Sequence, residues 1–236
     1  MFSKKPIIYL LIVCVYFTSA LSNDIFHANI YPEDDPGTLA FTHNNKISTQ
    51  GDSTVIDHFY YTPDGELYAK DKVILISDKP VFNSLKFYKI EEYSSFTLNG
   101  DKADLCFERE GKRRYVTRKM ETPLVFAPTQ QNAIKKYFSN LINGETIKFH
   151  IFASEVLRLV EMKVYMIENS KYEREGCVVF IMRPKNIFID WFVDEVFYVV
   201  ERSTGRLMEM HGFSTLRQKI NNKWEFKDMD FYYTYE

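Results

Sequence analysis

The stretch from Thr54 to Ile76, TVIDHFYYTPDGELYAKDKVILI, decides the fold. Before its turn, residues 55, 57, 59 and 61 alternate with residues 56, 58 and 60, in the period of two that is typical of a β-strand. The sequence PDG at 63–65 has the composition of a hairpin turn, and a second strand follows from Leu67 to Ile76. The stretch therefore predicts two antiparallel strands joined by a short turn.

Similar strand and turn signals continue as far as residue 120. A third strand is predicted from Phe82 to Tyr93, after a turn at residues 77–80. The dipeptide Asn-Gly at 99–100 is the strongest hairpin signal in the chain, and another turn at residues 110–112 leads into a strand from Arg113 to Met120. This half of the chain is therefore predicted to be an antiparallel meander.

The period changes between Pro128 and Gly144. Thr129 is a residue type that caps helices, and Gly144 stands where helices commonly end. Between them, apolar residues recur at spacings of three and four: Ile134, Phe138, Leu141 and Ile142. One helix is predicted from Gln130 to Asn143, and at about three turns it must pack its apolar face on the sheet to be stable.

The second half of the chain returns to strand patterns. The predicted strands are Glu145–Ala153, Arg158–Glu168, Glu175–Arg183, Val196–Glu201, Arg206–His211, Phe213–Ile220 and Trp224–Tyr235. No repeat of fixed period and no low-complexity linker divides them, so the sequence predicts a mainly β fold with one continuous antiparallel sheet and one packed mid-chain helix. Residues 51–236 are predicted to be a single β-rich domain, preceded by an extended leader at residues 23–50.

The first 22 residues have the layout of a secretory signal peptide. Lys4 and Lys5 precede an apolar run from Ile7 to Phe17, and small residues follow it. Cleavage after Ala20 or after Ser22 fits these small residues. An uncleaved anchor is the alternative, because so short an apolar run spans a bilayer only with help from its flanks. The sequence predicts export, to the periplasm or the extracellular medium.

The composition argues against some functions. The full chain has a formal net charge of −2, and cleavage would remove two lysines and no acid. This acidity argues against binding to nucleic acid or to an acidic membrane surface. A hydrophobic content of 45% is typical of a chain that forms a packed core. No run of about 18 apolar residues follows the leader, so the mature chain is predicted not to span a membrane.

Two cysteines follow the predicted signal peptide, Cys106 and Cys177. In an oxidising compartment they are a candidate disulfide, which would close a loop of about 70 residues and stabilise the fold by roughly 4 kcal/mol. Two unpaired thiols on different strands are the alternative. Neither cysteine belongs to the CxxC spacing of a redox or zinc site.

The chain lacks the common catalytic and cofactor-binding motifs, namely G-x-S-x-G, H-E-x-x-H, the P-loop and G-x-G-x-x-G. Its five histidines have no partner at i+2 or i+4, as a local metal site would usually show: His27, His43, His58, His150 and His211. We therefore predict no enzymatic activity, no cofactor and no metal site.

The densest basic patch comprises Lys112, Arg113, Arg114, Arg118 and Lys119. On a strand, Lys112, Arg114 and Arg118 share one face, where they could meet an anionic group or a protein partner. Alternating, solvent-exposed charge on a strand is the alternative interpretation.

The chain contains 20 Phe and 16 Tyr, many of them in the predicted strands. Aromatic side chains suit ordinary sheet packing, because they fit a pleated, half-buried surface. The alternative is that they line a concave sheet face, closed by the helix Gln130–Asn143, which binds an acyl chain or another apolar ligand. Consecutive aromatic residues at 59–61 and at 231–233 place rings on both faces of the sheet.

Several features together carry a resemblance to known proteins. They are the signal peptide, the meander, the mid-chain helix leading into Asn143-Gly-Glu-Thr-Ile-Lys148, the strand that ends Gly176-Cys-Val-Val179, and the hairpin Val199-Val-Glu-Arg-Ser-Thr-Gly-Arg-Leu207. Their order, from Val55 to Tyr235, resembles exported bacterial β-rich proteins of unknown function built on a strongly curved, rolled sheet. More distantly, it resembles the half-barrel lipoprotein carriers of the bacterial envelope. The resemblance implies a rolled or half-barrel sheet, an envelope location and a concave apolar face, and it carries over no functional residue.

Taken together, these features predict an exported, non-enzymatic envelope protein that binds an apolar or lipidic ligand in a concave sheet face. The alternative is a structural or interaction protein. Such a protein would hold an envelope partner through a sheet edge or through the patch from Lys112 to Lys119.

Overall fold

The computed structural model of this chain describes residues 25–120, 129–185, 195–221 and 223–236. Within them, one antiparallel sheet has the strand order β8-β7-β6-β5-β4-β3-β2-β1-β14-β13-β12-β11-β10-β9. Every neighbouring pair in this order is also consecutive along the chain, except for β1 and β14. The predicted signal peptide, residues 1–22, lies outside the described residues.

The strands differ in length from six to fourteen residues. They are β1 (Phe26–Pro32), β2 (Phe41–Gln50), β3 (Ser53–Tyr61), β4 (Leu67–Ile76), β5 (Lys79–Phe87), β6 (Glu92–Asn99), β7 (Lys102–Arg109), β8 (Lys112–Lys119), β9 (Ile147–Ala153), β10 (Arg158–Ile167), β11 (Cys177–Pro184), β12 (Val196–Glu201), β13 (Leu207–Ile220) and β14 (Lys223–Tyr235). Two short helices, α1 (Gln130–Lys136) and α2 (Phe138–Ile142), precede β9, and a 3-10 turn, η2 (Ser154–Val156), joins β9 to β10.

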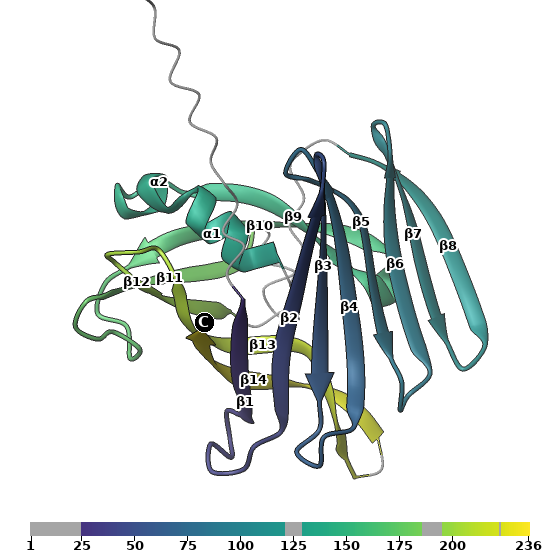
Figure 1. Ribbon diagram of the computed structural model, residues 1–236, viewed down its shortest axis with the longest axis horizontal. Coiled ribbons are helices and arrows are strands. Elements are labelled where there is room, and N and C mark those ends of the chain that lie inside the picture. The colour runs from purple at the N-terminus through teal and green to yellow at the C-terminus, as the bar shows by residue number, and fades with distance from the viewer. Residues whose placement is uncertain (1–24, 121–128, 186–194, 222) are drawn as a thin grey trace, which may run out of the picture.

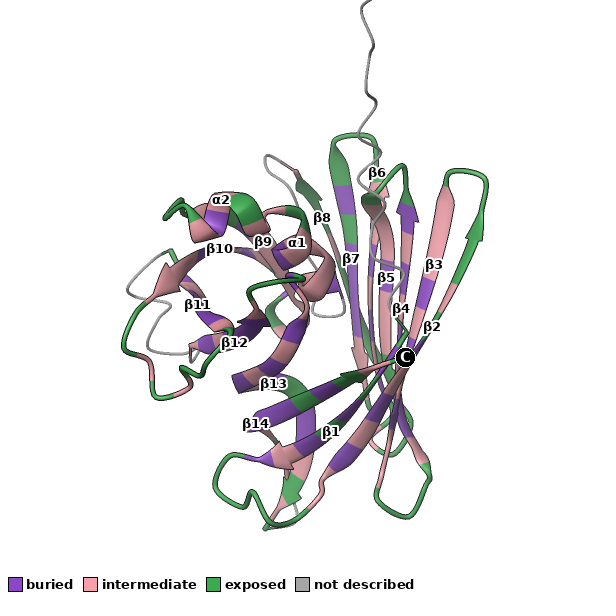
Figure 2. Cartoon of the chain, turned by 60° about the vertical axis from the view of Figure 1, so that its left-hand side comes forward, coloured by how far each residue is buried: buried purple, intermediate pink, exposed green. Residues whose placement is uncertain are grey.

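The strands form one strongly curved antiparallel sheet, which confirms the predicted fold class. Strands β1–β8, the first wing, and β9–β14, the second wing, face each other (Figure 1 and Figure 2), and buried apolar side chains from both wings pack between them. At the far end of the second wing, η2 contacts β7, and Leu157 packs on the inner face of β3–β7. The two edge strands, β8 and β9, have no ladder between them.

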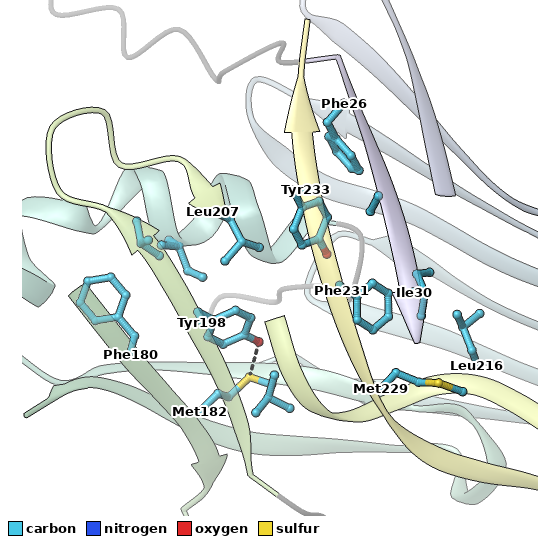
Figure 3. Packing of buried hydrophobic residues seen from close by; sticks show 14 of the residues in the cluster. Phe26, Ile30, Phe180, Met182, Tyr198, Leu207, Leu216, Met229, Phe231 and Tyr233 are labelled. Carbon is cyan, nitrogen blue, oxygen red and sulfur yellow. Dashed lines mark hydrogen bonds between the residues drawn. The ribbon is translucent and has the colours of Figure 1, made fainter. Parts of the chain in front are cut away.

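The core lies between the wings because alternate side chains of each strand point inward. In β1, Phe26, Ala28 and Ile30 are buried, while His27 and Asn29 between them are exposed. Figure 3 shows Phe26 and Ile30 of β1 together with Phe231 and Met229 of β14 in this interior. The shared core therefore holds the middle of the sheet in its curved form.

The predicted leader at residues 23–50 is not separate from the domain. β1 pairs with both β2 and β14, from Phe26 opposite Tyr235 to Pro32 opposite Met229, and therefore lies in the middle of the sheet. The alternation of apolar and polar residues in β1 is short, but it suits a strand that has one face in the core. The predicted boundary at residue 51 thus falls at the turn between β2 and β3.

The predicted single helix is divided into two at Tyr137. This residue has φ −103° and ψ 13°, outside the helical region, and both Tyr137 and Phe138 pack against the core. The division lets two adjacent aromatic rings reach the interior, which one face of a straight helix would not allow. None of the helices in the described part of the chain has the length and apolar character needed to cross a lipid bilayer.

Candidate functional site

An interior cavity of about 120 Å³ lies between the two wings. Its side on the first wing carries a row of polar side chains from five consecutive strands, here called the polar wall: His43, His58, Asp71, Asn83 and Ser94. The opposite side is mostly apolar and includes Met162, Met182, Val196, Leu207, Met210 and Phe213. Gln130 and Gln131 of α1 also border the cavity, as do Ser154 of η2 and Ser214 and Thr215 of β13. Figure 3 shows Met182, Leu207, Phe231 and Tyr233, which all border this space.

His43 and His58 form a buried, hydrogen-bonded pair in the polar wall. The distance from His43 Nε2 to His58 Nδ1 is 2.8 Å, and the His43 ring stacks on Tyr60. Burial lowers the pKa of His43 well below its ordinary value and that of His58 to about 3. Both rings are therefore neutral at pH 7.

The outer nitrogens of this pair are available to a ligand. His43 Nδ1 and His58 Nε2 are buried and have no hydrogen-bond partner among the described residues. In a neutral pair, one ring donates to the other, so the proton arrangement leaves one free donor and one free acceptor. This holds whichever ring donates. Because unsatisfied buried polar atoms cost roughly 1–3 kcal/mol each, the pair favours a group that both accepts and donates.

Asp71 lies beside His58, directly opposite it in the β3–β4 ladder. Its Oδ1 accepts a hydrogen bond of 2.5 Å from Asn83 Nδ2. Burial raises the pKa of the Asp71 carboxyl to about 8, although the bond from Asn83 opposes this change. At neutral pH the carboxyl is therefore mostly protonated, and the polar wall carries little charge.

Asp71→Asn is expected to stabilise the protein increasingly as the pH rises. The carboxyl titrates near pH 3.9 in the unfolded chain but near pH 8 in the folded protein, so between these values only the unfolded state has lost the proton. This group therefore lowers stability as the pH rises through that window. The gain from the substitution should grow by about 2 kcal/mol between about pH 5.5 and about pH 7, as measured by urea unfolding. Asp52→Asn, in an exposed turn, is the control; a gain from Asp71→Asn that does not change with pH would contradict the assignment.

A buried ion cluster ties the wings together beside the cavity. Arg217 of β13 pairs with Glu92 of β6 at 3.2 Å and with Glu155 of η2 at 2.6 Å. Arg109 of β7 also pairs with both carboxylates. The Arg217 guanidinium lies over the Phe226 ring, 3.9 Å from its centroid. None of these charged groups borders the cavity, so their role is to join the wings.

A second buried cluster surrounds His211 in β13. Its Nδ1 lies 2.7 Å from Asp230 Oδ1 and its Nε2 lies 3.0 Å from Glu209 Oε2, while Tyr172 stacks on the ring at 3.9 Å. Arg174 pairs with Glu209 at 2.5 Å. The cluster holds the connection before β11 against the sheet. Within the described ranges, no group of three His, Cys, Asp or Glu side chains is placed to hold a metal ion.

Of the two alternatives for Cys106 and Cys177, the structure shows the unpaired thiols and not the disulfide. Cys106 lies in β7 and Cys177 at the start of β11, and both thiols are free. Nine strands stand between β7 and β11 in the order of the sheet, whereas a disulfide needs Cα atoms within about 7 Å. Hairpin signals located each cysteine on a strand, but the distance between strands depends on the order of the whole sheet.

The five cations of the predicted basic patch all lie on the edge strand β8, but they do not form one surface: Lys112, Arg113, Arg114, Arg118 and Lys119. Arg113 points to one face and pairs with Glu108 at 2.6 Å. Arg114 points to the other face and donates to the Glu155 carbonyl oxygen at 2.5 Å. Arg118 and Lys119 border a separate hollow beside the β9–β10 hairpin.

The polar wall was not predicted from the sequence. His43 and His58 are 15 residues apart, so a search for histidines two or four residues apart does not connect them. The signal was the turn at Gly51, which pairs His43 with Tyr60 and Asn45 with His58 in the β2–β3 hairpin. Assigning residues 23–50 to a leader concealed that hairpin.

No protein-family model matches this chain, and no curated protein matches it in sequence. Among solved structures, the chain is similar to a β-barrel-like protein of a domain of unknown function, DUF1849, from Brucella abortus. The TM-score is 0.48 and the identity 8%, over 89% of this chain and 94% of that chain. It is also similar to a porin-like protein from Bacteroides uniformis, with a TM-score of 0.22 and 9% identity over 90% and 97% of the two chains. At these values neither similarity assigns an activity, a ligand or a location.

Proposed function

We propose that this protein is an exported binding protein that holds a compact, uncharged amphiphile in its interior cavity and releases it chemically unchanged. The observation that carries the proposal is the His43–His58 pair, which has two buried ring nitrogens with no hydrogen-bond partner among the described residues. A mostly apolar surface faces the polar wall across the cavity. A ligand with an apolar body and one hydrogen-bonding end matches both sides.

The volume of the cavity limits the size of the ligand. Pockets for drug-sized molecules have roughly 300–1,000 Å³, whereas an apolar cavity of about 150 Å³ takes a molecule the size of benzene. This cavity has about 120 Å³. The predicted apolar ligand is therefore narrowed from a whole acyl chain to a ring or a short chain.

The lining of the cavity argues for an uncharged ligand. Among the described residues, no lysine or arginine borders it, so a buried carboxylate would have no cation as a partner. Burying an ion without a partner costs several kcal/mol or more. Asp71 is mostly protonated at neutral pH, because burial raises its pKa to about 8. A hydroxyl group, which both donates and accepts, fits the two free histidine nitrogens best.

Export rests on the sequence of residues 1–22, whose lysines, apolar run and small residues follow the layout of a signal peptide. A binding protein in such a compartment would hold its ligand without transforming it. The proposal that the ligand is released unchanged is tested by comparing the mass of the molecule before binding with its mass after release from the protein.

Ser94→Leu is expected to abolish ligand binding, because it places a larger apolar side chain in the cavity. Ser95→Leu is the matched control, since Ser95 is the next residue of β6 and does not border the cavity. Native mass spectrometry of protein purified from the producing cells should show an added mass in the wild type and in the control, but not in Ser94→Leu. Because overpacking costs roughly 1–3 kcal/mol, the folding of each variant is checked by its melting curve.

A direct titration makes the test independent of what the cells supply. Phenol, benzoate and benzylammonium share a ring but differ in charge at neutral pH. We expect phenol alone to shift the NMR signals of residues around the cavity, in the wild type and in Ser95→Leu. Equal shifts from benzoate, or phenol shifts that persist in folded Ser94→Leu, would contradict the proposal.

A further inference from the structure

A basic hollow of about 420 Å³ lies where the end of β8 meets the β9–β10 hairpin. It is bordered by Arg118, Lys119, His150, Arg158 and Leu159, with no carboxylate among them. Within the described part of the chain, Arg118, Lys119 and Arg158 have no ion-pair partner. Three cations therefore border one space, and none of the described carboxylates lines it.

Two other cations of these strands or close to them do have carboxylate partners. Arg113 is paired with Glu108, and Lys185 is paired with Glu161. Cations along an edge strand often serve only to prevent pairing with another sheet, and that role would explain Arg118 and Lys119 of β8. It does not account for Arg158, which lies at the start of β10, opposite Ala153 of β9, and borders the same hollow from another hairpin.

We propose that the basic hollow binds a phosphate group. The planar guanidinium groups of Arg118 and Arg158 can each donate two parallel hydrogen bonds to phosphate oxygens, and Lys119 adds a third positive charge. A phosphate monoester carries about −1.5 to −2 charges at pH 7, which three cations balance. Inorganic phosphate and the head group of a lipid such as phosphatidate share this chemistry.

The hollow is separate from the interior cavity. His150 borders the hollow, whereas its neighbour in β9, Ile151, borders the cavity. No described residue lines both the hollow and the cavity. Phosphate binding therefore does not depend on the proposed amphiphile.

The test is a calorimetric titration of the full protein with inorganic phosphate at low salt. We expect phosphate to bind the wild type, and the affinity to fall by about tenfold for each of Arg118→Gln and Arg158→Gln. Arg113→Gln, on the same strand but on the opposite face, is the control and should bind as the wild type does. All three substitutions replace exposed or half-exposed side chains, and melting curves confirm that each variant is folded.

Vesicles identify the source of the phosphate group. Binding to phosphatidate vesicles but not to phosphatidylcholine vesicles, lost in Arg118→Gln, would support a lipid head group, whereas binding of inorganic phosphate alone would support a soluble ligand. The proposal would be overturned if the wild type bound neither inorganic phosphate nor phosphatidate vesicles. Equal binding by the wild type and both arginine variants would also overturn it. Capture of an acidic peptide without any affinity for phosphate would also overturn it.

Discussion

Arg217→Met is expected to lower the free energy of unfolding by about 3–5 kcal/mol. The Arg217 side chain is almost fully buried and pairs with Glu92, which is equally buried, as well as with Glu155. Methionine retains much of the apolar stem over Phe226 but removes the charge. Among the described residues, Glu92 would then keep only Arg109, which is partly exposed, as its cation.

Urea unfolding with Arg113→Met as the control measures this effect. Arg113 also forms an ion pair, but it is exposed, and exposed pairs contribute about 0–1 kcal/mol. The double variant Arg217→Met/Glu92→Gln should recover part of the loss, because it removes the buried carboxylate that was left uncompensated. A loss below about 1 kcal/mol in Arg217→Met would show that the ion cluster does not hold the wings together.

Gly212→Ala is expected to destabilise the protein by about 3 kcal/mol or more. Gly212 lies in β13 with φ +106°, a conformation that residues with a side chain rarely adopt. A Cβ atom at this position would lie 2.1 Å from the carbonyl oxygen of Glu195, before β12. Since that oxygen belongs to the backbone, no side-chain rotation relieves the contact, and the β12–β13 pairing would have to shift.

Gly51→Ala separates backbone strain from the steric contact. Gly51 has φ +62° in the β2–β3 turn, and a Cβ atom there would meet no atom within 4 Å. Its replacement should cost about 1–2 kcal/mol, clearly less than that of Gly212. Equal losses of stability in the two variants, measured by denaturant unfolding, would show that the close approach of Glu195 is unimportant.

Local patterns in the sequence were sufficient to predict most of the sheet. The Asn99-Gly100 turn places β6 opposite β7, with Leu98 facing Ala103 and Thr97 facing Asp104. Period-two alternation places Leu105 and Phe107 on one face of β7, and both are buried, although Cys106 between them is buried as well. Such predictions succeed because a hairpin turn and the face of each residue are determined by neighbours in the sequence.

The remaining features depend on contacts between distant parts of the chain. The junction of β1 with β14, the nine strands between the two cysteines, and the meeting of Arg158 with Arg118 all follow from how the complete sheet curves. The His43–His58 pair would have been easier to predict from the sequence, because only the β2–β3 turn had to be recognised. The side chains of the proposed sites come from several strands, and a local sequence motif does not identify such a set.

The pairing of β1 with β14 also determines when the protein can finish folding. Each wing is a meander of hairpins, and hairpins close quickly because their strands are near neighbours in the chain. β1 emerges first during synthesis but acquires its second partner only when residues 223–235 exist. Until then the chain has two unfinished sheet edges, at β1 and at β13, which are open to pairing with other chains. Completion of the sheet is thus tied to the synthesis of β14, and a chain that stops short of β14 is expected to aggregate rather than to form a smaller domain.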